Sequence, residues 1–147
     1  MAETLGMLCD KLTIVKLKQY HTTDELRLQS LDSQASQLQT EIDEYFADAI
    51  SGNIPISRLT FASNKVFKKE GNDVGEVVGK IGEIFYQLAN VNCTLWHEQE
   101  KVYEFKEVPL DEKDTVVKQL ALLNLERNKC IDAINTQFSQ IVLNIKK

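Results

Sequence analysis

The sequence contains little proline or glycine, with two and six residues respectively among 147. Disordered and low-complexity chains are usually rich in both residues, whereas 43% hydrophobic residues is typical of a globular protein. A chain of this length matches one ordinary domain and buries about two-thirds of its unfolded surface. We therefore expect a single domain that spans residues 1–147.

Positive charge and long apolar runs are also lacking. The formal net charge is −5, which argues against a general nucleic-acid-binding protein, because such proteins need a basic surface to displace counterions from phosphates. The longest uncharged run, from Ile84 to His97, is too short and too polar to cross a bilayer. We expect no general nucleic-acid binding and no membrane partner.

Cysteine is scarce and scattered. Cys9, Cys93 and Cys130 are odd in number, far apart and set in apolar helical patterns, which favours buried free thiols over disulfides or metal ligands. The chain opens without a basic segment followed by an apolar one, so no secretory signal is visible. These features predict a cytoplasmic protein, and they assign no metal or other cofactor.

The sequence does contain helical periodicity, and it has no strand pattern of convincing length. A first helix is predicted from about Thr4 to Thr22 or Thr23, and a second ends at Ser51-Gly52-Asn53. Ile14 and Leu17 fall on the face opposite the apolar series of the first helix, so we expect that helix to lie centrally. The two series, spaced by three and four residues, are Leu5, Leu8, Leu12 and Val15, and then Leu31, Ala35, Leu38, Ile42, Tyr45 and Ala49.

The middle of the chain is less regular. Residues 51–73 form a basic segment, with Arg58, Lys65, Lys68 and Lys69 around Phe61 and Phe67, and predict a short helix plus an exposed loop. Asp73 is then expected to cap a third helix that extends to about Lys106, roughly 50 Å at 1.5 Å per residue.

A turn at Val108-Pro109 makes the third helix and a fourth, capped by Asp111, an antiparallel hairpin. The predicted architecture is an all-α antiparallel bundle of four to five helices with this long C-terminal hairpin. The expected buried positions are Val78, Ile81, Phe85, Leu88, Asn92, Leu95, Gln99 and Val102 on the third helix. On the fourth they are Val117, Leu120, Asn124, Arg127, Ile131, Ile134, Phe138, Ile141 and Ile145.

A polar layer interrupts this aliphatic series. Pairing the two helices outward from their turn places Asn92 opposite Asn124, with Arg127 less than one turn further along. A buried guanidinium needs a partner. That partner is either an internal carboxylate, from Asp10 or Glu100, or an anion from outside, which a planar guanidinium binds in bidentate fashion.

The two alternatives give opposite expectations for Arg127→Met. With an external anion as the partner, the substitution should leave stability unchanged or raised, and this is the result that we expect from the sequence. With Asp10 or Glu100 as the partner, it should strand a buried carboxylate and lower stability. In that case the layer only fixes the register of the helices, as a single buried Asn does in coiled coils.

Other side chains predicted near this layer suit a small ligand. Trp96 lies one turn after Asn92, so that a ring could stack on the indole and bond to the carboxamide, although the indole also suits a core anchor. His21 suits proton transfer or the capping of a helix end, and His97 is expected to face solvent. The candidate ligand-binding residues are Asp10, Lys11, His21, Asn92, Trp96, Asn124 and Arg127, and none is assigned a catalytic role.

Three functions follow as hypotheses. The preferred one is a binding protein that holds an anionic small molecule, such as a nucleotide or sugar phosphate, in an interhelical cleft. The second is a magnesium-dependent nucleotide phosphohydrolase using Glu41, Glu44 and Asp48, although the second carboxylate pair of such enzymes has no counterpart with the right spacing. The third is an interaction or homo-oligomerisation protein with no small-molecule ligand.

Three stretches resemble a known group of proteins. Residues 8–14 read L-C-D-K-L-T-I, residues 92–100 read N-C-T-L-W-H-E-Q-E, and residues 127–135 read R-N-K-C-I-D-A-I-N. They resemble a bacterial and phage domain-of-unknown-function group with D-K-[LI]-[ST]-I, N-x-x-L-W-x-x-E and R-N-x-x-I-D-x-[IL]-N motifs. The resemblance covers both ends of the chain but not its basic middle, and it implies an all-α bundle without an established activity. Its shared residues fall on Asp10, Lys11, Asn92, Trp96, Arg127, Asn128, Asp132 and Asn135.

Overall fold

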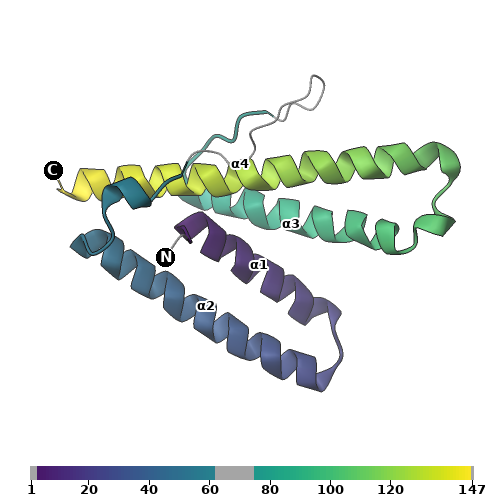
Figure 1. Cartoon of the computed structure of the whole chain (residues 1–147), viewed down its shortest axis with the longest axis horizontal. Coiled ribbons are helices and arrows are strands. Elements are labelled where there is room, and N and C mark those ends of the chain that lie inside the picture. The colour runs from purple at the N-terminus through teal and green to yellow at the C-terminus, as the bar shows by residue number, and fades with distance from the viewer. Residues whose placement is uncertain (1–2, 62–74, 147) are drawn as a thin grey trace.

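The computed structural model describes residues 3–61 and 75–146, and this part of the chain forms helices and no strand (Figure 1). Two helical hairpins make up the bundle, α1 with α2 and α3 with α4, and α1 packs against all three other helices. The predicted all-α bundle with a long C-terminal hairpin is confirmed. The helices are α1 (Leu5–His21), α2 (Glu25–Ser51), α3 (Ile81–Tyr103) and α4 (Lys113–Lys146). A short 3-10 turn, η1 (Ile56–Arg58), follows α2, and two more, η2 (Phe105–Glu107) and η3 (Leu110–Glu112), lie between α3 and α4.

The bounds of the first hairpin follow local capping chemistry. The hydroxyl of Thr4 accepts a hydrogen bond from the backbone N–H of Met7, and Asp24 accepts one from the backbone N–H of Arg27 at 3.0 Å. Gly52 ends α2 with a φ of +89°, a conformation that glycine adopts without strain. The predicted ends of the first helix and the predicted end of the second are confirmed.

The start of α3 was predicted wrongly. Asp73 lies outside the described residues, but residues 75–80 are not helical, and Gly79 has a φ of +125° that a helix does not contain. The helix starts at Ile81, where the Glu83 carboxylate accepts a hydrogen bond from the backbone N–H of Lys80 at 3.3 Å. It ends at Tyr103, so that α3 is roughly 35 Å long instead of 50 Å, and Val78 is exposed before it begins.

The fourth helix begins two residues after its predicted cap, because Asp111 belongs to the 3-10 turn η3. Its buried face is also rotated at both ends. Val117, Ile141 and Ile145 were expected inside and are exposed, whereas Val116 and Val142 are buried. The expected positions follow a strict seven-residue repeat, whereas the buried face of a straight α-helix rotates by about 20° per heptad relative to that repeat. Over the length of α4 this rotation adds up to nearly the angle between two neighbouring residues, so the neighbouring valines are buried instead.

The middle segment is anchored by Leu59, which is fully buried just after η1. The short helix predicted there is the 3-10 turn η1, and Arg58 and Phe61 are exposed. Lys65, Phe67, Lys68 and Lys69 lie outside the described residues.

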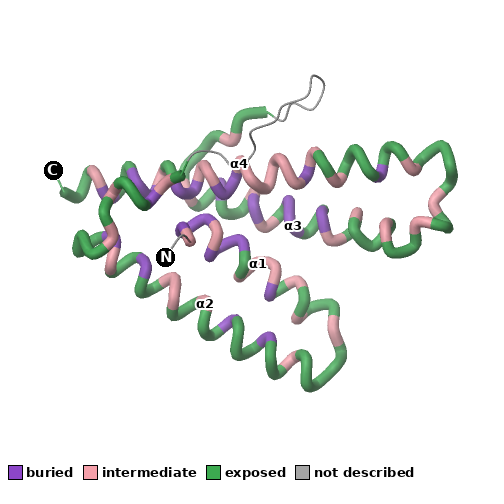
Figure 2. Tube along the Cα trace, in the orientation of Figure 1, coloured by how far each residue is buried: buried purple, intermediate pink, exposed green. Residues whose placement is uncertain are grey.

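The core lies where all four helices meet, and Figure 2 shows the buried residues concentrated there, while the α3–α4 turn is exposed. The helix α2 buries the positions its apolar series predicted, and Leu38 and Ile42 pack at the edge. The main cluster comprises Leu5, Leu8, Cys9, Tyr45, Ala49, Leu59, Ile84, Leu88, Cys130, Ile131, Ile134, Phe138 and Val142.

The three cysteines differ in their burial. Cys9 and Cys130 are buried as predicted, and burial raises the pKa of each to about 11, with the nearby charges of Asp10 and Glu126 respectively acting in the same direction. Cys93 was predicted buried but is exposed, because it lies on α3 about 100° from the buried Asn92. Within the described residues, no helix is both long and apolar enough to span a membrane.

The core gives a first test of the packing. Ile134→Ala should lower the free energy of unfolding by about 2–5 kcal/mol, because the side chain is buried and its removal leaves a cavity. Glu44→Ala, at an exposed position of α2, should change it by less than about 0.5 kcal/mol. Urea denaturation of both variants measures the difference, and equal losses would contradict the assignment of faces.

Candidate functional site

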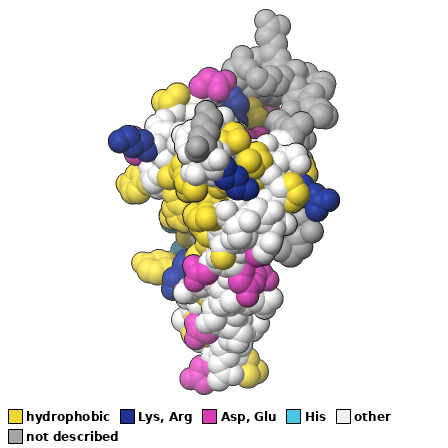
Figure 3. All heavy atoms as spheres, turned by 90° about the vertical axis from the view of Figure 1, so that its left-hand side faces the viewer, with side chains coloured by type: hydrophobic (Ala, Val, Ile, Leu, Met, Phe, Trp, Pro, Cys, Tyr) yellow, Lys and Arg dark blue, Asp and Glu magenta, His cyan; other side chains and the backbone are white. Residues whose placement is uncertain are grey.

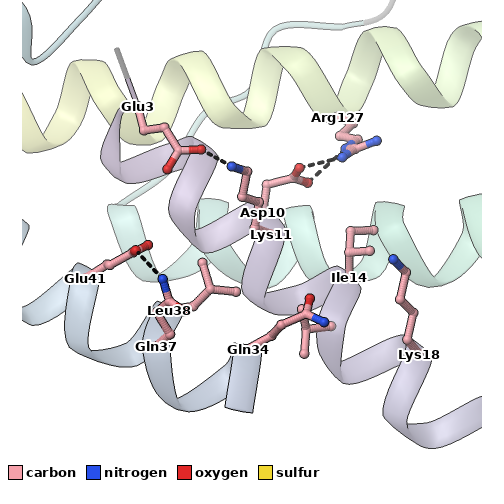
Figure 4. A pocket seen from close by; sticks show the side chains of 11 residues that line it. Glu3, Asp10, Lys11, Ile14, Lys18, Gln34, Gln37, Leu38, Glu41 and Arg127 are labelled. Atoms are coloured by element: carbon pink, nitrogen blue, oxygen red, sulfur yellow. Dashed lines mark hydrogen bonds and ion pairs between the residues drawn. The ribbon is translucent and has the colours of Figure 1, made fainter. Parts of the chain in front are cut away.

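The carboxylate of Asp10 joins three helices in the interior. Its Oδ1 accepts hydrogen bonds from Arg127 Nε at 2.8 Å and from Asn92 Nδ2 at 2.9 Å. Its Oδ2 accepts one from an Arg127 terminal nitrogen at 2.5 Å. Figure 4 shows the Asp10 side chain pointing from α1 toward Arg127 on α4. This bidentate ion pair ties α1 to α4, and Asn92 adds α3 to the same group.

Asn92 reaches α1 through a second contact as well. Its Nδ2 also donates to the hydroxyl of Thr13 at 2.7 Å, and this hydroxyl donates to the backbone carbonyl of Asp10 at 2.7 Å. The carboxamide is 1% exposed. Asp10, Thr13, Asn92 and Arg127 therefore form one network, which we call the Asp10 network.

The network decides which partner Arg127 has. Of the two internal carboxylates that the sequence offered, Asp10 pairs with it, whereas Glu100 accepts a hydrogen bond from Trp96 Nε1 at 3.0 Å. The hydrogen bonds to Asp10 raise the pKa of Arg127, although burial acts in the opposite direction. With both carboxylate oxygens occupied, the guanidinium does not need an external anion, which favours the register-fixing role.

Asn124 does not join the network, contrary to the prediction. Its Nδ2 donates to the backbone carbonyl of Leu120 on the same helix at 3.0 Å. The Asn124 carboxamide therefore bonds within its own helix instead of reaching Asp10.

Lys11 is likewise engaged inside the protein, since its ammonium group pairs with the Glu3 carboxylate (Figure 4). Both residues line an open cavity of about 490 Å³ between α1, α2 and α4, together with Asp10, Ile14, Val15, Lys18, Gln34, Gln37, Leu38, Glu41 and Arg127. Three acidic side chains match the three basic ones on its wall. This cavity therefore has no excess charge that would favour an anion.

A second cavity, of about 450 Å³, lies between the α1–α2 turn and α3. It contains two of the predicted ligand-binding residues, His21 and Trp96, and we call it the His21–Trp96 cavity. Its other lining residues are Lys18, Thr22, Arg27, Ser30, Leu31 and Gln34, so that no described residue on its wall carries a carboxylate. Lys18 and Gln34 line both cavities, which places the two side by side.

Two stacked aromatic rings line this cavity. The rings of His21 and Trp96 are stacked, with centroids 4.7 Å apart and planes inclined by 11°. Because Glu100 accepts the hydrogen bond from Trp96 Nε1, the orientation of the indole is fixed from its own helix. His97, which was expected to face solvent, is exposed.

Within the described residues, the cations of the His21–Trp96 cavity have no acidic partner. Neither the Lys18 ammonium nor the Arg27 guanidinium pairs with a carboxylate anywhere in the described chain. The contrast with Arg127 and Lys11 is direct, because both of those are neutralised by a neighbour. Two unpaired positive charges beside a stacked aromatic pair are therefore available to an anion.

The acidic face of α2 has no comparable arrangement. Within residues 3–61 and 75–146, no group of three His, Cys, Asp or Glu side chains is placed to hold a metal ion. Glu41 instead accepts a hydrogen bond from Gln37 on the preceding turn at 3.2 Å. No observation in the described chain thus favours the phosphohydrolase hypothesis.

Comparisons with protein-family models, with curated proteins and with solved structures gave no match for this chain. The resemblance of its motifs to a domain-of-unknown-function group stays a prediction. Three of the motif residues are structural in the described chain: Asp10, Asn92 and Arg127 belong to the Asp10 network.

Sequence reasoning missed Thr13, Lys18 and Arg27. Thr13 and Lys18 lie three and eight residues after Asp10 on one helix, and periodicity alone could have placed both on neighbouring faces. Arg27 gave no signal, because its place depends on how the α1–α2 turn brings the start of α2 next to α1 and Trp96.

Proposed function

We propose that the protein binds a small anionic molecule carrying a flat ring, such as a nucleoside phosphate, in the His21–Trp96 cavity. The observation that carries this proposal is the pair of unpaired cations, Lys18 and Arg27, on a cavity wall without a carboxylate. The volume of about 450 Å³ falls within the range of small-molecule sites. The proposal differs from the sequence-based one in its residues, since Asp10, Asn92 and Arg127 serve the fold.

Each group has a role that its chemistry supports. The Arg27 guanidinium binds two oxygens of a phosphate or carboxylate at once, and Lys18 adds a second positive charge on the opposite helix. The ring of the ligand packs against Trp96 and His21, whose existing stack offers a flat apolar surface. The Ser30 hydroxyl and the Gln34 carboxamide line the same cavity and supply neutral hydrogen bonds.

The chain carries its own reporter for this site. Trp96 is the only tryptophan, so fluorescence excited selectively at tryptophan reports on a residue that lines the His21–Trp96 cavity. We expect AMP and GMP to change this fluorescence saturably, while adenosine and guanosine, which lack the phosphate, have little effect. We also expect the same nucleotides to raise the melting temperature, because a ligand that binds only the native state stabilises it.

Substitutions at the two cations test the proposal. Lys18→Gln and Arg27→Gln should each raise the Kd for AMP roughly 10- to 100-fold, the loss expected for one charge-assisted hydrogen bond. The matched control is Lys16→Gln, which removes the same charge from α1 but faces an apolar groove with Leu12 and Tyr20. An equal loss in Lys16→Gln would indicate general electrostatic attraction, and no response to any phosphate at millimolar concentration would contradict the site.

A further inference from the structure

The two neighbouring cavities follow one another along the α1–α2 hairpin. Their lining residues recur at spacings of three and four, which places them on one face of each helix. Lys18 and Gln34, which line both cavities, are exposed, so they do not close one cavity off from the other. Figure 4 shows Gln34, Gln37 and Glu41 following one another along α2. We call the two cavities together the α1–α2 groove, whose lining residues include Lys11, Ile14, Lys18 and His21 on α1, and Arg27, Ser30, Gln34, Gln37 and Glu41 on α2.

The chemistry of this groove changes from one end to the other. The end at the α1–α2 turn is the His21–Trp96 cavity, with its stacked rings and the unpaired cations of Lys18 and Arg27. In the far half, the Gln37 carboxamide donates to the Glu41 carboxylate at 3.2 Å. Glu41 forms no ion pair in the described chain. The groove therefore offers cations at one end, and a carboxamide and a carboxylate at the other.

The charges along the groove restrict where a ligand can be negative. Beyond Arg27, every charged residue of α2 is acidic, and Figure 3 shows acidic side chains in the lower half of the molecule, where α2 lies. In the far half of the groove, Lys11 is already neutralised by Glu3. Arg127 is neutralised by Asp10 in the same way. A ligand that fills the whole groove is therefore best matched when its negative charge lies at the α1–α2 turn and its other end is uncharged.

We propose that the α1–α2 groove binds a sugar that is joined to a nucleoside through a diphosphate, an inference that rests on the nucleotide binding proposed above. Each phosphate of such a molecule carries one negative charge, and the two charges match the unpaired cations of Lys18 and Arg27. The base packs against Trp96, so that the sugar extends into the far half of the groove. The sugar is uncharged, and its hydroxyls donate to the Glu41 carboxylate and exchange hydrogen bonds with the Gln37 carboxamide.

Two ligands of equal charge test this inference on the full chain, with Trp96 fluorescence as the readout. One is ADP-glucose, and the other is ADP with a methyl ester on its terminal phosphate, which lacks the sugar. ADP-glucose should bind roughly 10-fold more tightly, because the sugar adds hydrogen bonds that include one to a carboxylate. Glu41→Ala should bring the ratio of the two Kd values close to one. Asp43→Ala is the matched control, since Asp43 is exposed on the same helix about 200° around from Glu41, and it should leave the ratio unchanged.

The outcomes separate this inference from the function on which it rests. If both ligands bind equally tightly to the wild-type chain, the sugar has no site in the far half, although the nucleotide site stands. A 10-fold ratio that survives Glu41→Ala, or falls equally in Asp43→Ala, would also overturn the contact between the sugar and Glu41. If neither ligand nor AMP binds, the proposed function fails and this inference fails with it. Circular dichroism of each variant without ligand checks that the helices are retained.

Discussion

Arg127→Met is expected to lower the free energy of unfolding by about 3 kcal/mol, the lower end of the range for breaking a buried ion pair. The Asp10 side chain is 7% exposed and keeps only the Asn92 hydrogen bond once the guanidinium is gone, so a charged carboxylate is left almost unpartnered in the interior. The lower end applies because the Arg127 side chain is itself 32% exposed and partly solvated.

This sign is the opposite of the one expected from the sequence, where an external anion was the preferred partner of Arg127. The double variant Asp10→Asn with Arg127→Met removes both charges and keeps an amide that can still bond to Asn92. It should recover most of the lost stability, which denaturant midpoints measure. Full stability in Arg127→Met alone would mean that Asp10 does not depend on the guanidinium, and would restore the external-anion hypothesis.

Arg127→Met also tests whether ligand binding is independent of the Asp10 network. Arg127 does not line the His21–Trp96 cavity, so Arg127→Met should leave AMP binding unchanged below the melting temperature of the variant. The sequence placed Arg127 and Trp96 in one site because the pairing of the third and fourth helices brings Arg127 near Asn92, and because Trp96 lies one turn after Asn92. This pairing does not show that Asp10 is close enough to occupy the guanidinium completely.

Much of the fold was predictable because it depends on local patterns. The apolar series on α1 and α2, and the caps at Thr4 and Gly52, are set by residues within one or two turns of each other. What failed depends on distant contacts. Whether Asn124 joins the polar layer depends on which acceptor its carboxamide reaches, and it bonds to the Leu120 carbonyl on its own helix.

The His21–Trp96 cavity was even harder to predict, because its residues lie far apart in the sequence. Lys18, Arg27 and Trp96 belong to three helices, and no spacing in the sequence connects them. Their significance also lies partly in a missing partner, since only the folded chain shows that Lys11 is neutralised by Glu3 whereas Lys18 is not. A charge count along the sequence treats the two lysines alike.

Close approach between helices is the other feature that periodicity does not reveal, and it underlies the prediction for Gly6. This residue is the second of α1, and its N–H donates to the Asn135 side-chain oxygen of α4 at 2.7 Å. A Cβ at this position would lie 2.5 Å from the backbone oxygen of Ile131 and 2.9 Å from that Asn135 oxygen. Real Cβ atoms do not approach a backbone oxygen so closely, so α1 would have to move away from α4.

Gly6→Ala should therefore lower the free energy of unfolding by roughly 2–4 kcal/mol through overpacking and the weakened Asn135 hydrogen bond. Gly82→Ala is the matched control, because Gly82 is also the second residue of its helix and a Cβ there meets nothing within 4 Å. Alanine should stabilise that position by up to about 1 kcal/mol, since its helix propensity exceeds that of glycine. The two variants share the same change in propensity, so the difference between their unfolding free energies isolates the α1–α4 contact. Two variants that both gain stability would show that α1 does not lie against α4 at Gly6.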